Sequence, residues 1–145
     1  MAAMEEALST YIITKAEVSA IIGSGVNARL FPIVVPETVN LANGPAATYE
    51  IVSSSETDLL TGRDGIVQSR VQIASFATTH SAVMLLARAI KNTGIATLKG
   101  IYAGVDFRGV MIEDGIQCFA EQPTDGSDTW RYIAEFDLRV SYLEG

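Results

Sequence analysis

The chain has 145 residues, of which 48% are hydrophobic and 19% are charged, and its formal net charge is −7. This length and composition predict one globular domain over residues 1–145. Its ten basic residues are scattered, so no cluster could neutralise a run of phosphates, and the acidic balance disfavours nucleic acid and anionic membranes as direct partners.

The single cysteine, Cys118, excludes an intramolecular disulfide and fits a reducing compartment. The N-terminus has neither a basic region nor a continuous apolar region, so no secretion signal is expected. No apolar run approaches the ~20 residues that span a bilayer. We therefore expect a soluble protein made in the cytoplasm, with no membrane partner.

Helical signals come first along the chain. Residues 4–13 predict a helix with Glu5 and Glu6 in its first turn, where the helix dipole favours negative charge. Thr14 and Glu17 match a capping box, which predicts a break and a second short helix ending at Ile22. A single helix over residues 4–22 is the alternative.

Residues 23–45 form a long segment without regular periodicity. It contains Pro32, Pro36 and Pro45, with Asn43-Gly44-Pro45 as a turn signal. Its apolar content distinguishes it from a disordered linker. We expect residues 30–45 to be an extended loop or arm that lies along its own core or reaches onto a neighbour, with a short edge strand in part of it.

The centre of the chain predicts two strands and a helix. Residues 47–53 are expected to be a strand, and 54–65 a polar loop. Residues 66–77 alternate in part between apolar and polar side chains, which indicates a strand with one face in a core. From His80 to about Asn92 we expect an amphipathic helix whose apolar stripe contains Ala82, Leu85, Leu86, Ala89 and Ile90.

The C-terminal third predicts further strands. Residues 95–104 read as a connector, 105–121 as one bent strand or two short ones around Asp114-Gly115, and 122–128 as a polar loop. Residues 129–143 alternate almost perfectly, which is typical of a half-buried strand. The expected fold class is α+β: a mostly antiparallel sheet of about four strands, with the N-terminal and central helices packed on one face.

Motifs for catalysis or metal binding are weak. Residues 23–28 match G-x-G-x-x-A, but they follow a helix and open a loop, so they predict a helix stop rather than a dinucleotide site. His80 is the only histidine and lies at a helix start, and Cys118 is interpreted as a small buried hydrophobe. Solvated turns are the interpretation for the acidic groups Asp106, Glu113 and Asp114, or Asp125 and Asp128. We therefore expect no catalytic, cofactor-binding or metal-binding residues.

A patch of mixed charge is predicted where the central and final strands would be neighbours. One interpretation is a solvated sheet face. The other is a subunit interface, where mixed charges fix register and select partners. The candidate interface residues on these strands are Gln68, Arg70, Gln72, Arg131, Glu135, Asp137 and Arg139.

In its order of features the chain resembles the tail-completion or tail-terminator family of long-tailed bacteriophages, which also occurs in prophages and gene transfer agents. It departs from the family pattern in its longer segment 32–45 and in its connector 95–104. The matching stretches, in order, are Ala20-Ile21-Ile22-Gly23, Ala28-Arg29-Leu30-Phe31-Pro32, Pro45 leading into Thr48-Tyr49-Glu50-Ile51, Arg70-Val71-Gln72-Ile73 with Phe76-Ala77, a helix with Ala82, Leu86 and Ala87, and a closing strand over residues 132–140.

The resemblance implies a non-enzymatic virion protein in the tail or neck. It implies a homo-oligomeric ring, typically a hexamer, that ends the tail tube, meets the head–tail connector or stopper protein, and lets DNA pass through its lumen without sequence-specific binding. The extended segment then adds Leu30, Phe31, Ile33 and Val35 as candidate interface residues. The alternatives are a head-side joining or stopper protein of the same neck and, in another class, a small ligand-binding domain or enzyme.

Overall fold

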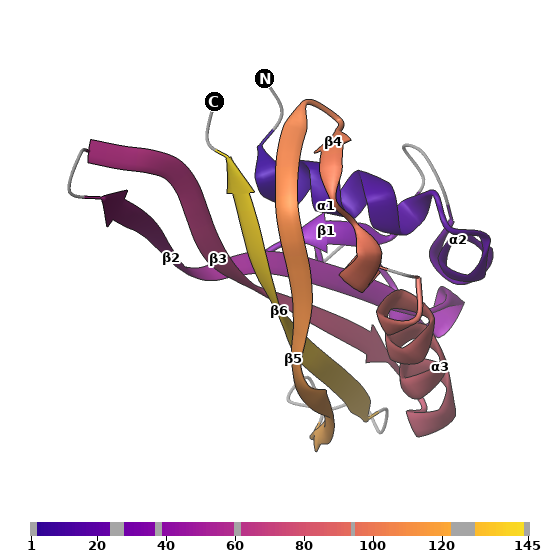
Figure 1. Cartoon of the computed structure of the whole chain (residues 1–145). Coiled ribbons are helices and arrows are strands. Elements are labelled where there is room, and N and C mark those ends of the chain that lie inside the picture. The colour runs from indigo at the N-terminus through magenta and orange to yellow at the C-terminus, as the bar shows by residue number, and fades with distance from the viewer. Residues whose placement is uncertain are drawn as a thin grey trace.

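The computed structural model describes residues 3–23, 28–36, 39–59, 62–93, 95–122 and 130–143. Within them, six strands form one sheet in the order β1-β2-β3-β6-β5-β4 (Figure 1). The elements, in chain order, are α1 (Met4–Ile13), α2 (Ala16–Ile22), β1 (Leu30–Pro32), the 3-10 helix η2 (Leu41–Asn43), β2 (Ala46–Leu59), β3 (Gly62–Ala77), α3 (His80–Lys91), the 3-10 helix η3 (Ile95–Thr97), β4 (Gly100–Tyr102), β5 (Val105–Glu121) and β6 (Arg131–Leu143). None of the described helices is long and apolar enough to cross a membrane.

The predicted sheet of about four mostly antiparallel strands was wrong. The sheet has six strands in the described residues and is mixed, because β1 runs parallel to β2 while the other pairs are antiparallel. β1 is the short edge strand expected within residues 30–45, whereas β4 was not predicted, and each is three residues long. A strand of that length shows no alternation, so its pairing is decided by its neighbour rather than by its own pattern.

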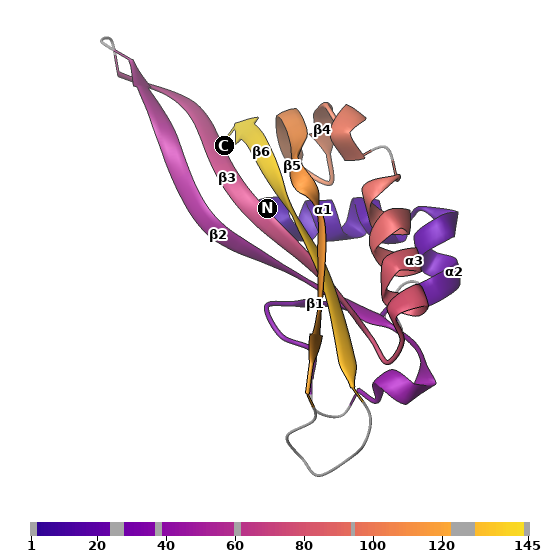
Figure 2. The same cartoon turned by 90° about the horizontal axis from the view of Figure 1, so that it is seen from below.

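The predicted loop over residues 54–65 was also wrong, because β2 and β3 continue through it as a long hairpin. The serines at 53–55 pair with residues 68–70, and the hydroxyls of Ser54 and Ser69 lie 2.7 Å apart in a hydrogen bond. Pairing along the hairpin overrides the low strand tendency of a polar run. Figure 2 shows the hairpin extending well beyond the helices.

The N-terminal helices are separate, as the first interpretation of the sequence predicted. A break falls at Thr14 and Lys15, and α1 buries Met4, Leu8 and Ile12 along one face. The predicted capping box was wrong: Lys15 occupies the N-cap of α2 without a side-chain cap, and the Thr14 hydroxyl donates instead to the carbonyl of Tyr11.

The helix predicted from His80 is α3, which begins after an N-cap at Thr79 whose hydroxyl accepts a hydrogen bond from the Ala82 amide. Its buried stripe is Val83, Leu86, Ala87 and Ile90. Leu85 was expected in this stripe but is 61% exposed.

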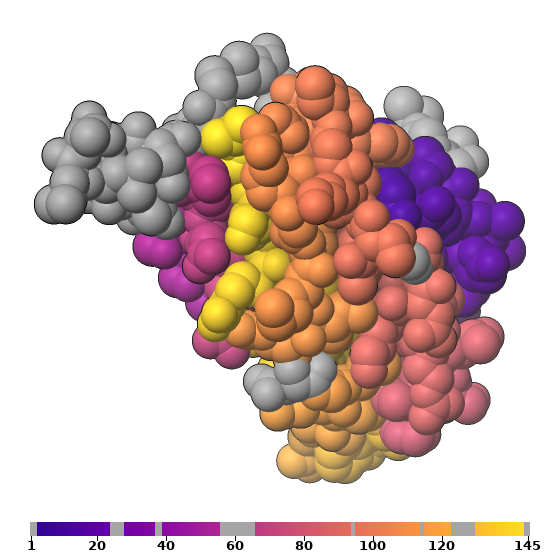
Figure 3. Space-filling view, in the orientation of Figure 1, coloured from indigo at the N-terminus to yellow at the C-terminus, as the bar shows by residue number. Residues whose placement is uncertain are grey.

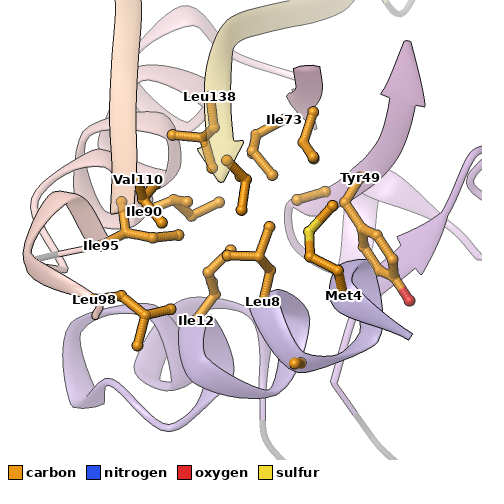
Figure 4. Packing of buried hydrophobic residues seen from close by; sticks show 14 of the residues in the cluster. Met4, Leu8, Ile12, Tyr49, Ile73, Ile90, Ile95, Leu98, Val110 and Leu138 are labelled. Carbon is orange, nitrogen blue, oxygen red and sulfur yellow. The ribbon is translucent and has the colours of Figure 1, made fainter. Parts of the chain in front are cut away.

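The core lies between the helices and the inner face of the sheet. Figure 4 shows Leu8 and Ile12 of α1 pointing into the same space as Ile73, Ile90 and Leu138. All five side chains are fully buried. The predicted inward face of the last strand is confirmed, because alternate residues of β6 between Ala134 and Val140 are buried. One face of the sheet is therefore committed to folding, and the opposite face is left for other contacts.

Ser75 provides a stability test of this inner face. Its side chain is fully buried in β3, and its hydroxyl has no hydrogen-bond partner among the residues that the structure describes. Burying an unpaired hydroxyl lowers stability, so Ser75→Ala should raise the free energy of unfolding by about 1 kcal/mol. Urea titration would measure the change. A lower midpoint for the variant would show that the hydroxyl makes a stabilising contact after all.

Candidate functional site

The candidate site is the outer face of the sheet, opposite the helices, where β3, β6 and β5 lie side by side (Figure 1). The register aligns residues across the three strands. Arg70 is paired with Arg139, Gln72 with Asp137, and Ala74 with Glu135. On the far side of β6, Glu113 pairs with Asp137, and Gln117 pairs with Glu135. The strand neighbours required by the predicted charged patch are therefore present.

Four of these side chains form one ion-pair network. The Arg70 guanidinium contacts Asp137, with Nη2 2.6 Å from Oδ2, and its Nε lies 3.7 Å from Oε2 of Glu113. The Arg139 guanidinium pairs with the other oxygen of Glu113. Both carboxylate side chains are only 18% exposed, so these pairs are less screened by solvent than fully exposed ones. The network fixes the relative positions of three strands on this face.

Glu113 was not among the predicted interface residues, although it joins the two arginines. Sequence reasoning assigned it to a solvated turn because the neighbouring Asp114-Gly115 signals a turn. In the structure β5 continues past that signal as one strand, the first of the two predicted alternatives, with a bulge where the register shifts between Glu113 and Gln117. Placing β5 next to β6 would have located Glu113 on this face.

Arg131 lies at the other end of the same face and makes different contacts. It pairs with Glu121, and its guanidinium carbon is 5.4 Å from the centre of the Phe76 ring. Phe76 aligns with Ile133 and, through it, with Phe119 of β5. The outer face therefore changes from a charged half around Arg70 to a half with an apolar row.

Glu135 lies between the two halves, in a shallow hollow beside the bulge. No described cation forms an ion pair with it. Partial burial, and then the nearby charges of Asp137 and Glu50, raise the pKa of its carboxyl above the ordinary value of 4.5. The hollow is lined by Arg70, Gln72, Gly115, Gln117, Glu135, Phe136 and Asp137. It is polar and open, and it lacks the apolar enclosure typical of a small-molecule site.

The raised pKa of Glu135 predicts a pH-dependent stability. The neutral carboxyl stabilises the fold fully below pH 4.5, and this contribution is lost as the pH rises through the higher folded pKa. Glu135→Gln should therefore have a slightly higher thermal midpoint at pH 7, and the difference should shrink as the pH is lowered toward 4.5. Circular dichroism melts at several pH values would measure it. Glu17→Gln, at an exposed position of α2, is the matched control, and an equal rise there would contradict the explanation.

The remaining predicted interface residues lie elsewhere. Gln68 is exposed on the projecting part of β3, opposite Ser55 and Ser141. Leu30 and Phe31 belong to β1 and are partly buried, Ile33 is 70% exposed just after it, and Val35 is partly buried. Because β2 and β3 separate β1 from β6, these four residues do not join the charged patch.

The side chains that could take part in catalysis or metal binding do not form a catalytic arrangement in the described chain. His80 is exposed and stacks edge-on against Tyr132, with ring centres 6.3 Å apart. Cys118 was expected to be buried but is exposed on β5, so that prediction was wrong. The residues that the structure describes contain no group of three His, Cys, Asp or Glu side chains able to hold a metal ion.

Comparison with known proteins finds similarity among solved structures. No protein-family model matches the chain, and no curated protein matches it. Among solved structures, the chain is similar to a chain from the virion of a native gene transfer agent particle, with a TM-score of 0.62 and 13% identity. The match covers 98% of this chain and 96% of the other. The two chains therefore share one fold over almost their full lengths.

Proposed function

We propose that the chain is a structural protein of a phage-like virion. The observation that carries this proposal is the match over 96% of a chain from a gene transfer agent particle, which leaves almost no part of either chain outside the common fold. The open, mixed-charge face of the sheet supports a role in assembly rather than catalysis, because such faces select partners and fix register.

Within the virion, we propose that copies of the chain form a ring, a hexamer, that ends the tail tube and joins it to the head-side connector or stopper protein. This finer role rests on the ordered resemblance along the sequence to tail-terminator proteins. The net charge of −7 supports a lumen through which DNA passes without being held or read, because like charges do not bind the phosphate backbone.

The test is to combine the purified chain with tube protein and with head-side connector protein from the same source. Light scattering should give a closed assembly near six times 15.5 kDa. Electron microscopy should show that it binds one end of preformed tubes and stops their growth. Binding to the connector ring alone would instead assign the chain to the head side of the neck. A chain that remains monomeric and binds neither would overturn the proposal.

A further inference from the structure

Both long edges of the sheet are open along most of their length in the described chain. β1 pairs with β2 only at residues 47–49, and β4 pairs with β5 only at residues 105–107. Beyond these points, residues 50–59 of β2 and 108–121 of β5 have no described strand on their outer side. Their outward backbone groups are free to pair with another strand.

The open edge of β2 has a central stretch, residues 51–55, with no charged side chain to oppose pairing. Residues 46–55 contain neither proline nor lysine, and Ile51 and Val52 are 39% and 55% exposed. The acidic residues Glu50, Glu56 and Asp58 flank this stretch. The register shift between Ile51 and Ser53 lies within it and leaves Val52 at the surface. An exposed sheet edge that carries two β-branched side chains and no charge over residues 51–55 would promote aggregation unless a partner covers it.

Two further aliphatic side chains stand at the start of this edge. The Ile33 amide donates to the carbonyl of Tyr49, and the chain then leaves the sheet in a tight turn in which the Val34 amide donates to the carbonyl of Pro32. Ile33 and Val34 are 70% and 66% exposed. The turn holds Ile33 at a φ of 67°, which is costly for a β-branched residue. Because strained backbone clusters at functional sites, the strain and the exposed aliphatic side chain together make Ile33 a candidate contact residue.

The open edge of β5 lies at the opposite end of the same sheet. It carries the exposed side chains Met111 and Phe119. In Figure 3 β5, in orange, is at the surface between β6 in yellow and the helical side of the molecule. Because the two open edges are different surfaces on opposite ends of one sheet, a copy placed beside another can pair them head to tail. Repeated contacts of this kind close into a ring when the rotation allows it.

We propose that the open edge of β2 in one copy pairs with the open edge of β5 in the next, so that the sheet continues from chain to chain. The occupant is a second copy, because this arrangement covers both edges in every chain, whereas a two-fold contact between β2 edges leaves both β5 edges open. The inference rests on the proposed ring and names the surfaces that build it.

The first experiment introduces charge at the β2 edge. Val34→Lys and Val52→Lys should each raise the protein concentration needed for assembly by about tenfold or more. Lysine at 52 opposes pairing on an edge strand, and lysine at 34 places a charge among the exposed aliphatic side chains at the start of that edge. Leu85→Lys, an equally exposed aliphatic position on α3, is the matched control and should assemble like the wild type. Light scattering over a concentration series, with circular dichroism to verify folding, provides the readout. Edge variants that assemble normally would overturn the proposal.

Ile33→Gly separates folding from assembly. Glycine adopts the positive φ freely, so the thermal midpoint should not fall, while loss of the side chain should weaken assembly. Weakened assembly together with an unchanged or higher midpoint supports the proposal. Unchanged assembly would show that Ile33 makes no contact between copies, and would overturn the assignment of Ile33 to the interface.

Cross-linking distinguishes the two ways of pairing. Cys118 is a natural reporter on β5, and cysteine can be placed singly at Ser53, Ser54 and Ser55 on β2. Oxidation should produce a ladder of linked chains from at least one variant, and Cys118→Ser should abolish it. Dimers that persist with Cys118→Ser would indicate β2–β2 contact and overturn the head-to-tail arrangement.

A ring that forms without any cross-link, and that tolerates both lysine variants, would overturn this inference while leaving the proposed function standing. A wild-type chain that is monomeric alone and with tube protein would overturn both.

Discussion

Replacing Phe107 with alanine should lower the free energy of unfolding by about 3–5 kcal/mol, a large part of the total stability of a typical domain. Phe107 is fully buried and is the largest such side chain in the described core. It is held on the inner face of β5, opposite Tyr142 of β6 and Gly100 of β4. Its removal would leave a cavity where the edge of the sheet meets the core, and the paired strands on both sides limit how far the structure can relax.

Phe119→Ala is the matched control for this prediction because it makes the same chemical change on the same strand. Phe119 is 47% exposed on the outer face, so its truncation should change the free energy of unfolding by less than about 1 kcal/mol. Urea unfolding would be measured at a protein concentration at which light scattering shows a single oligomeric state for each variant. Differences in assembly then do not contribute to the measured free energy of unfolding. Similar losses in the two variants would show that Phe107 is less important to the core than its burial indicates.

The elements that sequence reasoning located are those that carry their own periodic signal. The strand ending near Leu143 alternates over more than ten residues, and its inward side chains are the ones that the structure buries. The break after Ile13 was also found, although not for the expected reason, because Thr14 bonds backward to Tyr11 and does not cap the next helix. A hydrophobic pattern rests on many buried residues, so it predicts an element even where one local interaction is misassigned. A capping motif rests on a single hydroxyl, which can bond to other backbone groups instead.

Elements that depend on a partner strand were missed or left without bounds. A short edge strand was expected within residues 30–45 but β1 could not be placed in it, β4 is too short to show a pattern, and residues 54–59 became part of β2 only because β3 lies beside them. Burial was also misjudged at Cys118, which lies beyond the bulge of β5 and is exposed. A sequence shows which face of a strand is apolar, but the pairing order decides whether anything covers that face.

The candidate site was predictable in part. Arg70, Asp137 and Arg139 were selected on the condition that their two strands were neighbours, and the register aligns them. Glu113 was missed because its strand contains a turn signal, although it completes the network between the two arginines. The exposed aliphatic edge at Val34 and Val52 could not be predicted, because exposure of an apolar residue is a property of the assembled fold.

In helix α3, two adjacent leucines differ strongly in burial. Leu85 and Leu86 were both placed in the predicted stripe, and a helix turns by about 100° per residue, so a narrow contact can bury only one of them fully. Helix α3 packs against β3, β6 and α2, and this packing decides which of its faces is buried. The buried face contains Val83, Leu86 and Ile90. Leu86 is fully buried, while Leu85 is 61% exposed.

Truncating these two leucines should therefore give very different results. Leu86→Ala should lower the free energy of unfolding by about 2–5 kcal/mol, through lost burial and a residual cavity. Leu85→Ala should stay within about 0.5 kcal/mol of the wild type, since alanine also favours the helix. Urea titration of both variants under one condition would measure the difference. The two substitutions are chemically identical and adjacent on one helix, so they form a matched pair. Equal losses of unfolding free energy would mean that Leu85 is covered by another chain. The contact between copies would then lie on the helical side of the molecule rather than on the sheet edges.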